Sequence, residues 1–199
     1  MSILGLKIDA LFVAAQLVGF LATGMGVASY QTKHRSNIII RQIIANTGWI
    51  IHYLMLGSYS AVVANSIGTV RNILYSFRGK YKFADSKLIP TISIIIFVIS
   101  GAITYKDAFD ILPTFAMIVA SIALYIKDEK IIRYLSILLP VSWLLYAIRH
   151  FSIAGVISES LVLISVVVSI VRYHGMEKQN GVDVTKTSRK NSVENEEIR

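Results

Sequence analysis

Seven runs of mostly apolar residues divide this chain, and each is close to the length that a helix needs to cross the hydrocarbon core of a bilayer. The runs cover residues 9–30, 37–56, 58–77, 88–105, 108–126, 131–148 and 151–173. Short polar or basic links separate most of them, whereas the second and third runs are separated only by Gly57 and Ser58. The pattern predicts an all-α integral membrane protein with seven transmembrane helices.

The composition agrees with a lipid environment. Hydrophobic residues make up 54% of the chain and charged residues only 16%, which is more apolar surface than a soluble domain of 199 residues can bury. The chain has no cysteine, so disulfides, thiolate metal sites and cysteine nucleophiles are excluded. The net charge of +8 lies in the links and the tail, which favours membrane orientation over nucleic-acid binding. We expect no metal site and no cofactor.

The distribution of basic residues predicts the orientation of the chain. Sixteen Lys and Arg residues fall on one side of the seven segments and three, Lys7, Lys106 and Arg149, on the other. Positive residues accumulate on the cytosolic side, so we expect the N-terminus outside and the C-terminus in the cytosol. The stretch after residue 174 has almost nothing to bury and predicts a disordered cytosolic tail over 175–199. A signal peptide is the alternative for the first segment, but that segment has a counterpart later in the chain.

The sequence also repeats itself at an offset of 94 residues. The offset places Trp49 on Trp143, Ser58 on Ser152, Ser66 on Ser160, Lys33 on Lys127 and Arg78 on Arg172. Chance similarity between apolar helices is the alternative, but link lengths and basic ends also agree. Only the fourth segment has no partner, and one extra span lets two three-helix units run parallel across the membrane. We therefore predict a 3+1+3 layout: a first repeat (1–82), a linker helix (83–106), a second repeat (107–174) and the tail.

Polar side chains at mid-membrane depth mark the candidate site, because such residues are costly in lipid. Asn65 and Glu159 occupy matching positions, each 16 residues after a tryptophan. The predicted substrate-binding residues are Trp49, His52, Asn65, Trp143, Tyr146 and Glu159. Asn65 also belongs to a stripe of small and polar residues, for which helix packing is the alternative role. Arg71 and Glu159 are a candidate ion pair or proton relay, and Arg71 could instead reach the cytosolic surface.

With this layout and these residues, the chain resembles the SWEET/PQ-loop (MtN3-like) superfamily and, within it, the YgjV-type bacterial inner membrane proteins. The segments that carry the likeness are HYLMLGSYSAVVANSIGTVRNIL and ISESLVLISVVVSIVRYHGMEKQNGVD. The resemblance implies a bacterial inner membrane location and a sugar pocket between the repeats, with Trp49, Asn65 and Trp143 matching its pattern. Glu159 departs from it, standing where an asparagine is expected, and the proline–glutamine signature is absent.

We expect a transporter, either a uniporter or proton-linked, for a small polar metabolite, with a sugar first and a nucleoside or vitamin second. Alternating access would expose the pocket between the two repeats to each side in turn. The alternative is a non-transporting membrane sensor or accessory protein with the same fold. An enzyme is not expected, since no H-E-x-x-H or G-x-S-x-G motif is present. Asp107 and Asp110, the one close acidic pair, are expected only to end a loop and start a helix. A monomer would suffice, and a homo-oligomer stays open.

Overall fold

The long apolar segments are helices in the computed structural model, which describes residues 2–3, 6–7, 9–30, 35–77, 79–123, 125–126 and 128–173. A helix satisfies its backbone N–H and C=O groups within one segment, which lipid requires. Each predicted segment overlaps one of these helices, so the helical class of the fold is confirmed. These helices are α1 (Ala10–Tyr30), α2 (Arg35–Met55), α3 (Tyr59–Ser76), α5 (Leu88–Thr104), α6 (Ile111–Ala123), α7 (Glu129–Arg149) and a C-terminal helix (Ile153–Tyr173).

Shorter elements lie between and before these helices. A two-stranded antiparallel sheet, β1 (Ser2–Ile3) and β2 (Leu6–Lys7), precedes α1, where the sequence indicated only a polar start. The link between α3 and α5 contains α4 (Lys82–Asp85). The predicted span 108–126 is divided into the 3-10 turn η1 (Ala108–Asp110) and α6, because the Asp107 side chain caps a separate first turn. The predicted tail 175–199 lies outside the described residues.

Three of the helices are long and apolar enough to cross a membrane by length and composition alone. These are Ala10–Ser29, Ile131–Arg149 and Ile153–Tyr173, and two shorter apolar helices cover Leu88–Thr104 and Ala108–Ala123. The C-terminal helix leaves Leu161 56%, Ile164 60% and Val171 65% exposed. Side chains of this kind would be poorly solvated by water, so the exposed surface indicates contact with lipid.

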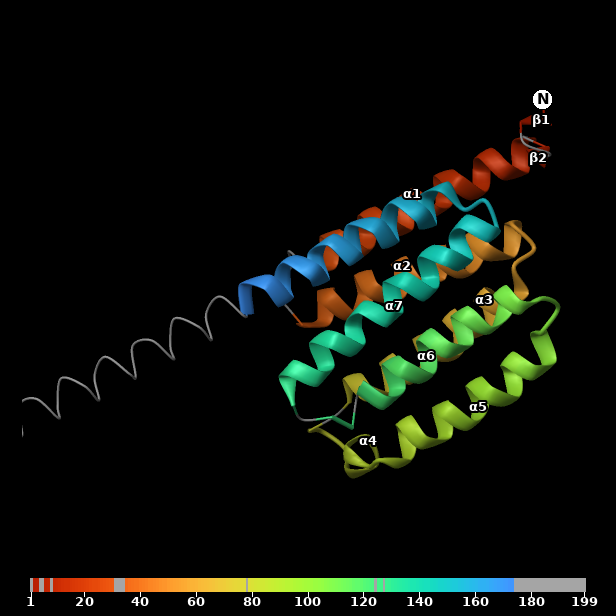
Figure 1. Cartoon of the computed structure of the whole chain (residues 1–199). Helices are drawn as coiled ribbons and strands as arrows, with labels where there is room; N and C mark the ends of the chain where they lie inside the picture. The colour runs from red at the N-terminus through yellow and green to blue at the C-terminus, as the bar shows by residue number, and fades with distance from the viewer. Residues whose placement is uncertain are drawn as a thin grey trace, which may run out of the picture.

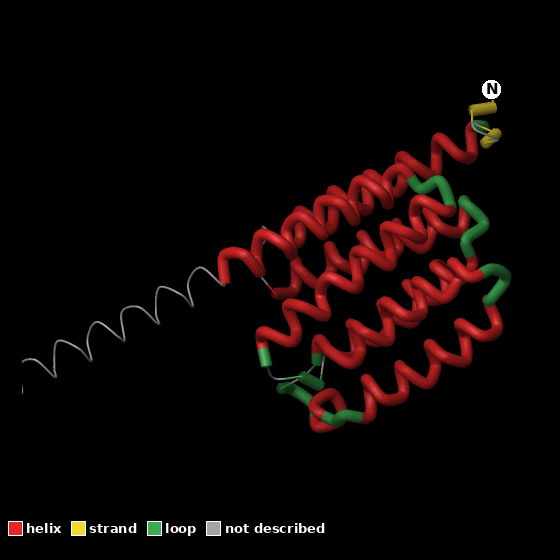
Figure 2. The backbone as a smooth tube through the Cα atoms, in the orientation of Figure 1, coloured by secondary structure: helices red, strands yellow, loops and turns green. Residues whose placement is uncertain are grey.

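Helices that follow one another in the chain pack side by side (Figure 1). The packed pairs are α1 with α2, α2 with α3, α3 with α5 and α6, α5 with α6, and α6 with α7. Their links gather at two opposite ends of the bundle (Figure 2). We call the end with β1, β2, η1 and the turns after α2 and α7 the hairpin end, and the end with α4 the α4 end.

The turns that end α2 and α7 have the same backbone geometry. After α2, the amide of Ser58 bonds the carbonyl of Tyr53 and the amide of Gly57 bonds the carbonyl of Leu54. After α7, Ser152 bonds Ala147 and Phe151 bonds Ile148 in the same way. This pairing is a Schellman motif, which needs a left-handed residue: Gly57 has a φ of 71° and Phe151 a φ of 53°. All four pairs of matching positions are separated by 94 residues.

The turn after α2 makes a stability prediction. Gly57→Ala places a Cβ on a left-handed residue, so it should lower the free energy of unfolding by about 1 kcal/mol. Gly24→Ala, inside α1, is the matched control, because an added Cβ there meets nothing within 4 Å. Thermal unfolding of both variants in detergent measures the difference. Equal effects of the two substitutions would contradict the requirement for a left-handed glycine.

Candidate functional site

Four aromatic side chains from α2 and α7 form a cluster that contains three of the predicted site residues. The Tyr53 ring stacks on Trp49, with centroids 5.9 Å apart and an interplanar angle of 28°. The same ring lies 5.8 Å from the ring of Trp143 and 5.8 Å from that of Tyr146. The structure therefore brings Trp49, Trp143 and Tyr146 together, but Tyr53 fills the space between the two tryptophans. The sequence analysis missed Tyr53, although its position four residues after Trp49 puts both on one helix face.

His52 joins α2 to two other helices through a buried chain of hydrogen bonds. Its Nδ1 lies 2.7 Å from the carbonyl oxygen of Ala15, and its Nε2 lies 2.6 Å from the hydroxyl of Ser152. A carbonyl can only accept, so Nδ1 carries the proton and Nε2 accepts from Ser152. The Ser152 oxygen in turn accepts from the amide of Gly155 at 3.0 Å. The predicted site residue His52 thus fixes the start of the C-terminal helix against α1.

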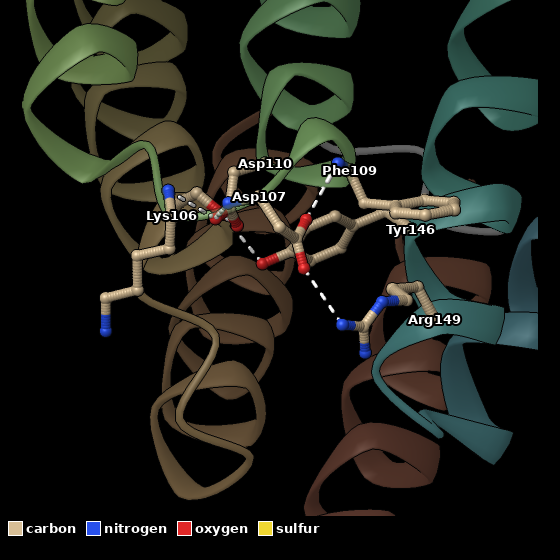
Figure 3. A network of polar contacts seen from close by, with 7 residues as sticks. Lys106, Asp107, Phe109, Asp110, Tyr146 and Arg149 are labelled. Atoms are coloured by element: carbon tan, nitrogen blue, oxygen red, sulfur yellow. Dashed lines mark hydrogen bonds and ion pairs between the residues drawn. The ribbon is translucent and has the colours of Figure 1, made fainter.

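A second buried chain joins Tyr146 on α7 to α3 and η1 (Figure 3). The Ser60 hydroxyl donates to Oδ1 of Asp110 at 2.6 Å, which leaves its oxygen to accept from the Tyr146 hydroxyl at 2.7 Å. Oδ2 of Asp110 accepts from the amides of Lys106 and Asp107. Asp107 and Asp110 form a capping box, so the expectation that they end a loop and start a helix is confirmed. Asp110 also holds α3, a role that sequence analysis did not predict.

Gln16 on α1 makes a third contact of this kind. Its Oε1 accepts from the amide of Ala154 at 3.0 Å, and its Nε2 donates to the carbonyl of Phe151 at 3.3 Å. The first amides of a helix have no partner within the helix, so the buried amide of Ala154 needs one from outside. Gln16 supplies it, and the start of the C-terminal helix is therefore held by a residue that is distant in sequence.

The three contacts correspond to one another at the same offset as the two turns. Gln16 corresponds to Asp110, His52 to Tyr146, and Ala154 to Ser60, each pair being 94 residues apart. Gln16 accepts from the backbone amide of Ala154, and Asp110 accepts from the side-chain hydroxyl of Ser60, so the positions correspond but the donors differ. His52 and Tyr146 both reach serines at the start of a helix that lies in the other half of the sequence. We call these contacts at the hairpin end the polar interlock.

The other two predicted site residues, Asn65 and Glu159, lie farther from the hairpin end and make fewer contacts. The amide of Asn65 donates to the carbonyl of Ala61 in its own helix at 3.0 Å. Glu159, on the C-terminal helix, is half-buried. Asn65 lies one turn from Ala61, which belongs to the buried core with Tyr53 and Trp143.

The small and polar stripe of α3 serves two purposes along its length. Ala61 and Ala64 belong to the buried core with Trp143, and a Cβ on Gly68 would lie 3.2 Å from Met117. Helix packing therefore accounts for this part of the stripe. Nearer the α4 end the stripe lines a cavity of about 30 Å³, large enough for a water molecule. The polar side chains around this cavity are Gln42, Asn46, Thr69, Asn72 and Ser76.

The structure does not bring Arg71 and Glu159 together. The Arg71 guanidinium donates to the Ser121 hydroxyl at 2.6 Å, to the Met117 carbonyl and to the Asn72 side chain, and it lies 5.7 Å from the centre of the Phe97 ring. Arg71 is 6% exposed and its guanidinium bonds residues of α6, so it does not extend along α3 to the end of the bundle, which was the alternative. An arginine at the centre of a membrane helix costs about 2.5–3.5 kcal/mol on insertion scales, and its acceptors among the described residues are all neutral.

A metal site and a buried ion pair are the other arrangements considered for the described part of the chain. No group of three or more His, Cys, Asp or Glu side chains there could hold a metal ion. The ion pair between Arg149 and Asp107, at 3.0 Å, is exposed and contributes little to stability. The candidate site therefore consists of the aromatic cluster, Asn65 and Glu159. The polar interlock lies toward the hairpin end and the small polar cavity toward the α4 end.

A comparison with protein families gives a match. A family model described as Imp-YgjV, bacterial inner membrane protein, matches residues 13–177. Neither a curated protein nor a solved structure matches the chain. The matched range includes every residue of the candidate site and of the polar interlock.

The polar interlock can be tested by removing one hydroxyl. Ser152→Ala leaves Nε2 of His52 buried without a partner, so it should lower the free energy of unfolding by about 1–3 kcal/mol. Ser142→Ala is the matched control: Ser142 is also buried, but its hydroxyl bonds only the Leu138 carbonyl of its own helix. Chemical or thermal unfolding in detergent compares the two. A Ser152 variant as stable as the Ser142 variant would show that the His52 contact has no energetic role.

Proposed function

We propose that this chain, which belongs to the Imp-YgjV family of bacterial inner membrane proteins, is a transporter for a small polar metabolite. Transport would occur by alternating access, as a uniporter or linked to protons, with a sugar as the first candidate substrate. Family membership and the apolar helices make it a multi-pass inner membrane protein in contact with the lipid bilayer.

The observation that carries the proposal is the different character of the two ends of the bundle. At the hairpin end, the polar interlock joins the two halves of the sequence through side chains that are almost fully buried, among them His52, Ser152 and Ser60. Toward the α4 end, a small polar cavity lies between α2 and α3 and begins at Thr69, one turn from Asn65. A protein that is closed at one end and polar toward the other has the asymmetry that alternating access requires.

The proposed layout is 3+1+3, with two parallel three-helix repeats and α5 as the linker helix. The Schellman turns after α2 and α7 support it, as do the pairs Gln16 with Asp110 and His52 with Tyr146, since all recur at 94 residues. Hydrogen-bonding positions are not shared by chance as readily as apolar residues are. We also propose the SWEET/PQ-loop placement on this basis, together with an outside N-terminus and a cytosolic C-terminus.

The proposed roles of the site residues follow from the aromatic cluster. Trp49 and Trp143 would hold the flat face of a substrate once Tyr53 turns out of the space between them, and Tyr146 and His52 would frame it. Asn65 would donate a hydrogen bond to the substrate in place of the one it gives to Ala61. Glu159 would select the substrate or carry a proton. A proton role requires transport that depends on pH and loses this dependence in Glu159→Gln.

A non-transporting sensor or accessory protein is the second proposal, and one observation favours it. Tyr53 is 2% exposed and packs against both tryptophans, so the aromatic cluster resembles a completed core more than an open pocket. Such a core would serve a protein whose polar interlock never opens. Binding of a polar solute at the cluster separates the two proposals.

Ligand screening by thermal unfolding provides this test. We expect a sugar, nucleoside or vitamin at tenfold its dissociation constant to add about 1.4 kcal/mol of stability, a shift of about 3–6 °C for a chain of this size. Asn65→Ala should abolish the shift. Thr104→Ala, which also removes a bond to the carbonyl of its own helix but lies on α5, should keep it.

Two results would count against the transporter. A protein that melts cooperatively and responds to no compound would favour the sensor or accessory protein. A shift that survives in Asn65→Ala would place the ligand away from the aromatic cluster.

A further inference from the structure

A groove of about 350 Å³ runs along the outer surface between α3 and α5. Its walls are mostly apolar and come from Ile67, Val70 and Leu74 on α3 and Ile89, Ile92 and Ile96 on α5, with Ser66 and Ser93 beside them. The residues on α5 span two turns, so the groove follows the helix axis for about 10 Å. Long and narrow apolar walls of this kind fit an extended hydrocarbon chain.

Arg71 also lines this groove, and it gives the groove a positive charge. Its side chain is buried, and the acceptors it has among the described residues are a hydroxyl, a carbonyl and an amide oxygen. Buried charges in membrane proteins are normally paired. The positive charge of Arg71 is therefore not neutralised by the described part of the chain, and an anion at the groove would neutralise it.

More positive charge lies where the groove reaches the α4 end. The link from α3 to α5 carries Lys80, Lys82 and Lys87, and all three are exposed. Leu74 and Ile89 line the groove within a turn of the ends of this link, so the link that carries the lysines joins the two walls at the α4 end, and Lys87 directly precedes α5. Arg71 precedes the end of α3 by five residues, or about 7 Å along the axis. The arrangement is an apolar groove with a cationic end.

We propose that the groove between α3 and α5 binds an anionic phospholipid. One acyl chain lies along the isoleucines of α5. The phosphate lies at the α4 end of the groove, where the Arg71 guanidinium attracts it electrostatically. Basic pockets between membrane helices bind anionic head groups in this way. The lipid neutralises a buried charge and fixes α3, which carries Asn65, against α5. The site is separate from the aromatic cluster and does not depend on transport.

A second groove shows that shape alone does not select the ligand. It lies between α5 and α6, has a larger volume of about 430 Å³, and is lined by Val98, Gly101, Ala102, Tyr105, Ile111 and Thr114, none of which is charged. This groove accepts hydrocarbon without preferring an anion. It therefore supplies a control for the charge requirement.

The test is thermal unfolding of the full-length protein in detergent micelles with added phosphatidylglycerol, phosphatidylcholine or inorganic phosphate. We expect phosphatidylglycerol to raise the melting temperature by about 3–6 °C at tenfold its dissociation constant. The zwitterionic lipid and inorganic phosphate should give less than a third of that shift. Ile92→Phe, which fills the groove, should remove the difference between the lipids, and Ala102→Phe in the second groove should keep it.

The charge requirement is tested by Arg71→Gln and by the double variant Lys82→Gln with Lys87→Gln, the latter changing only exposed residues. Each should reduce the preference for phosphatidylglycerol by at least half. Equal shifts with the two lipids would overturn the proposal. A full response to inorganic phosphate would indicate an ion site without a lipid, and a response unchanged in Ile92→Phe would indicate general attraction to the surface lysines. Both results would also overturn it.

Discussion

The hydrogen-bonding groups at the start of a membrane helix need partners, and in this protein the partners come from the other half of the chain. Gln16 on α1 accepts the amide of Ala154, and His52 on α2 holds Ser152, so the C-terminal helix begins against α1 and α2. Asp110 and Tyr146 bond the side-chain hydroxyl of Ser60 at the start of α3. An unpaired polar group in this environment costs several kcal/mol. The polar interlock therefore restricts how the helices of one half of the chain can pack against those of the other half. The packing of the C-terminal helix and of α3 at the hairpin end follows from it.

The sequence predicted the parts of the fold that depend on local composition. Apolar runs gave the long helices, and Gly57 followed by Ser58 marked the turn after α2. The offset of 94 residues aligned Trp49 with Trp143, and the structure adds matching turns and hydrogen bonds at the same offset. The predicted span 108–126 is not one continuous helix, because Asp107 and Asp110 form a capping box that makes a separate first turn.

The candidate site was predicted less well, since it depends on which side chains fill the space between helices. Trp49, Trp143 and Tyr146 do meet, but the side chain between the tryptophans is Tyr53, which an apolar helix pattern does not distinguish from a core residue. The partner of Arg71 could not be predicted either. Glu159 was the nearest acidic candidate by depth, whereas Ser121 and the Met117 carbonyl lie on α6, whose rotation the sequence does not specify.

The halves differ in ways that bear on function. The small polar cavity uses Asn46, Thr69 and Asn72, and the residues 94 positions later are Pro140, Leu163 and Val166. The polar lining beside α2 and α3 therefore has no counterpart at the positions 94 residues later. Reagent access to the small polar cavity tests most directly whether the interlock closes the hairpin end, and the absence of native cysteine allows it with single substitutions. Asn46→Cys should react with a membrane-impermeant thiol reagent from the α4 side and not from the hairpin side, whereas the exposed Ile44→Cys, which faces lipid, should react from neither. Labelling of Asn46→Cys from the hairpin side, or from neither side, would contradict the account.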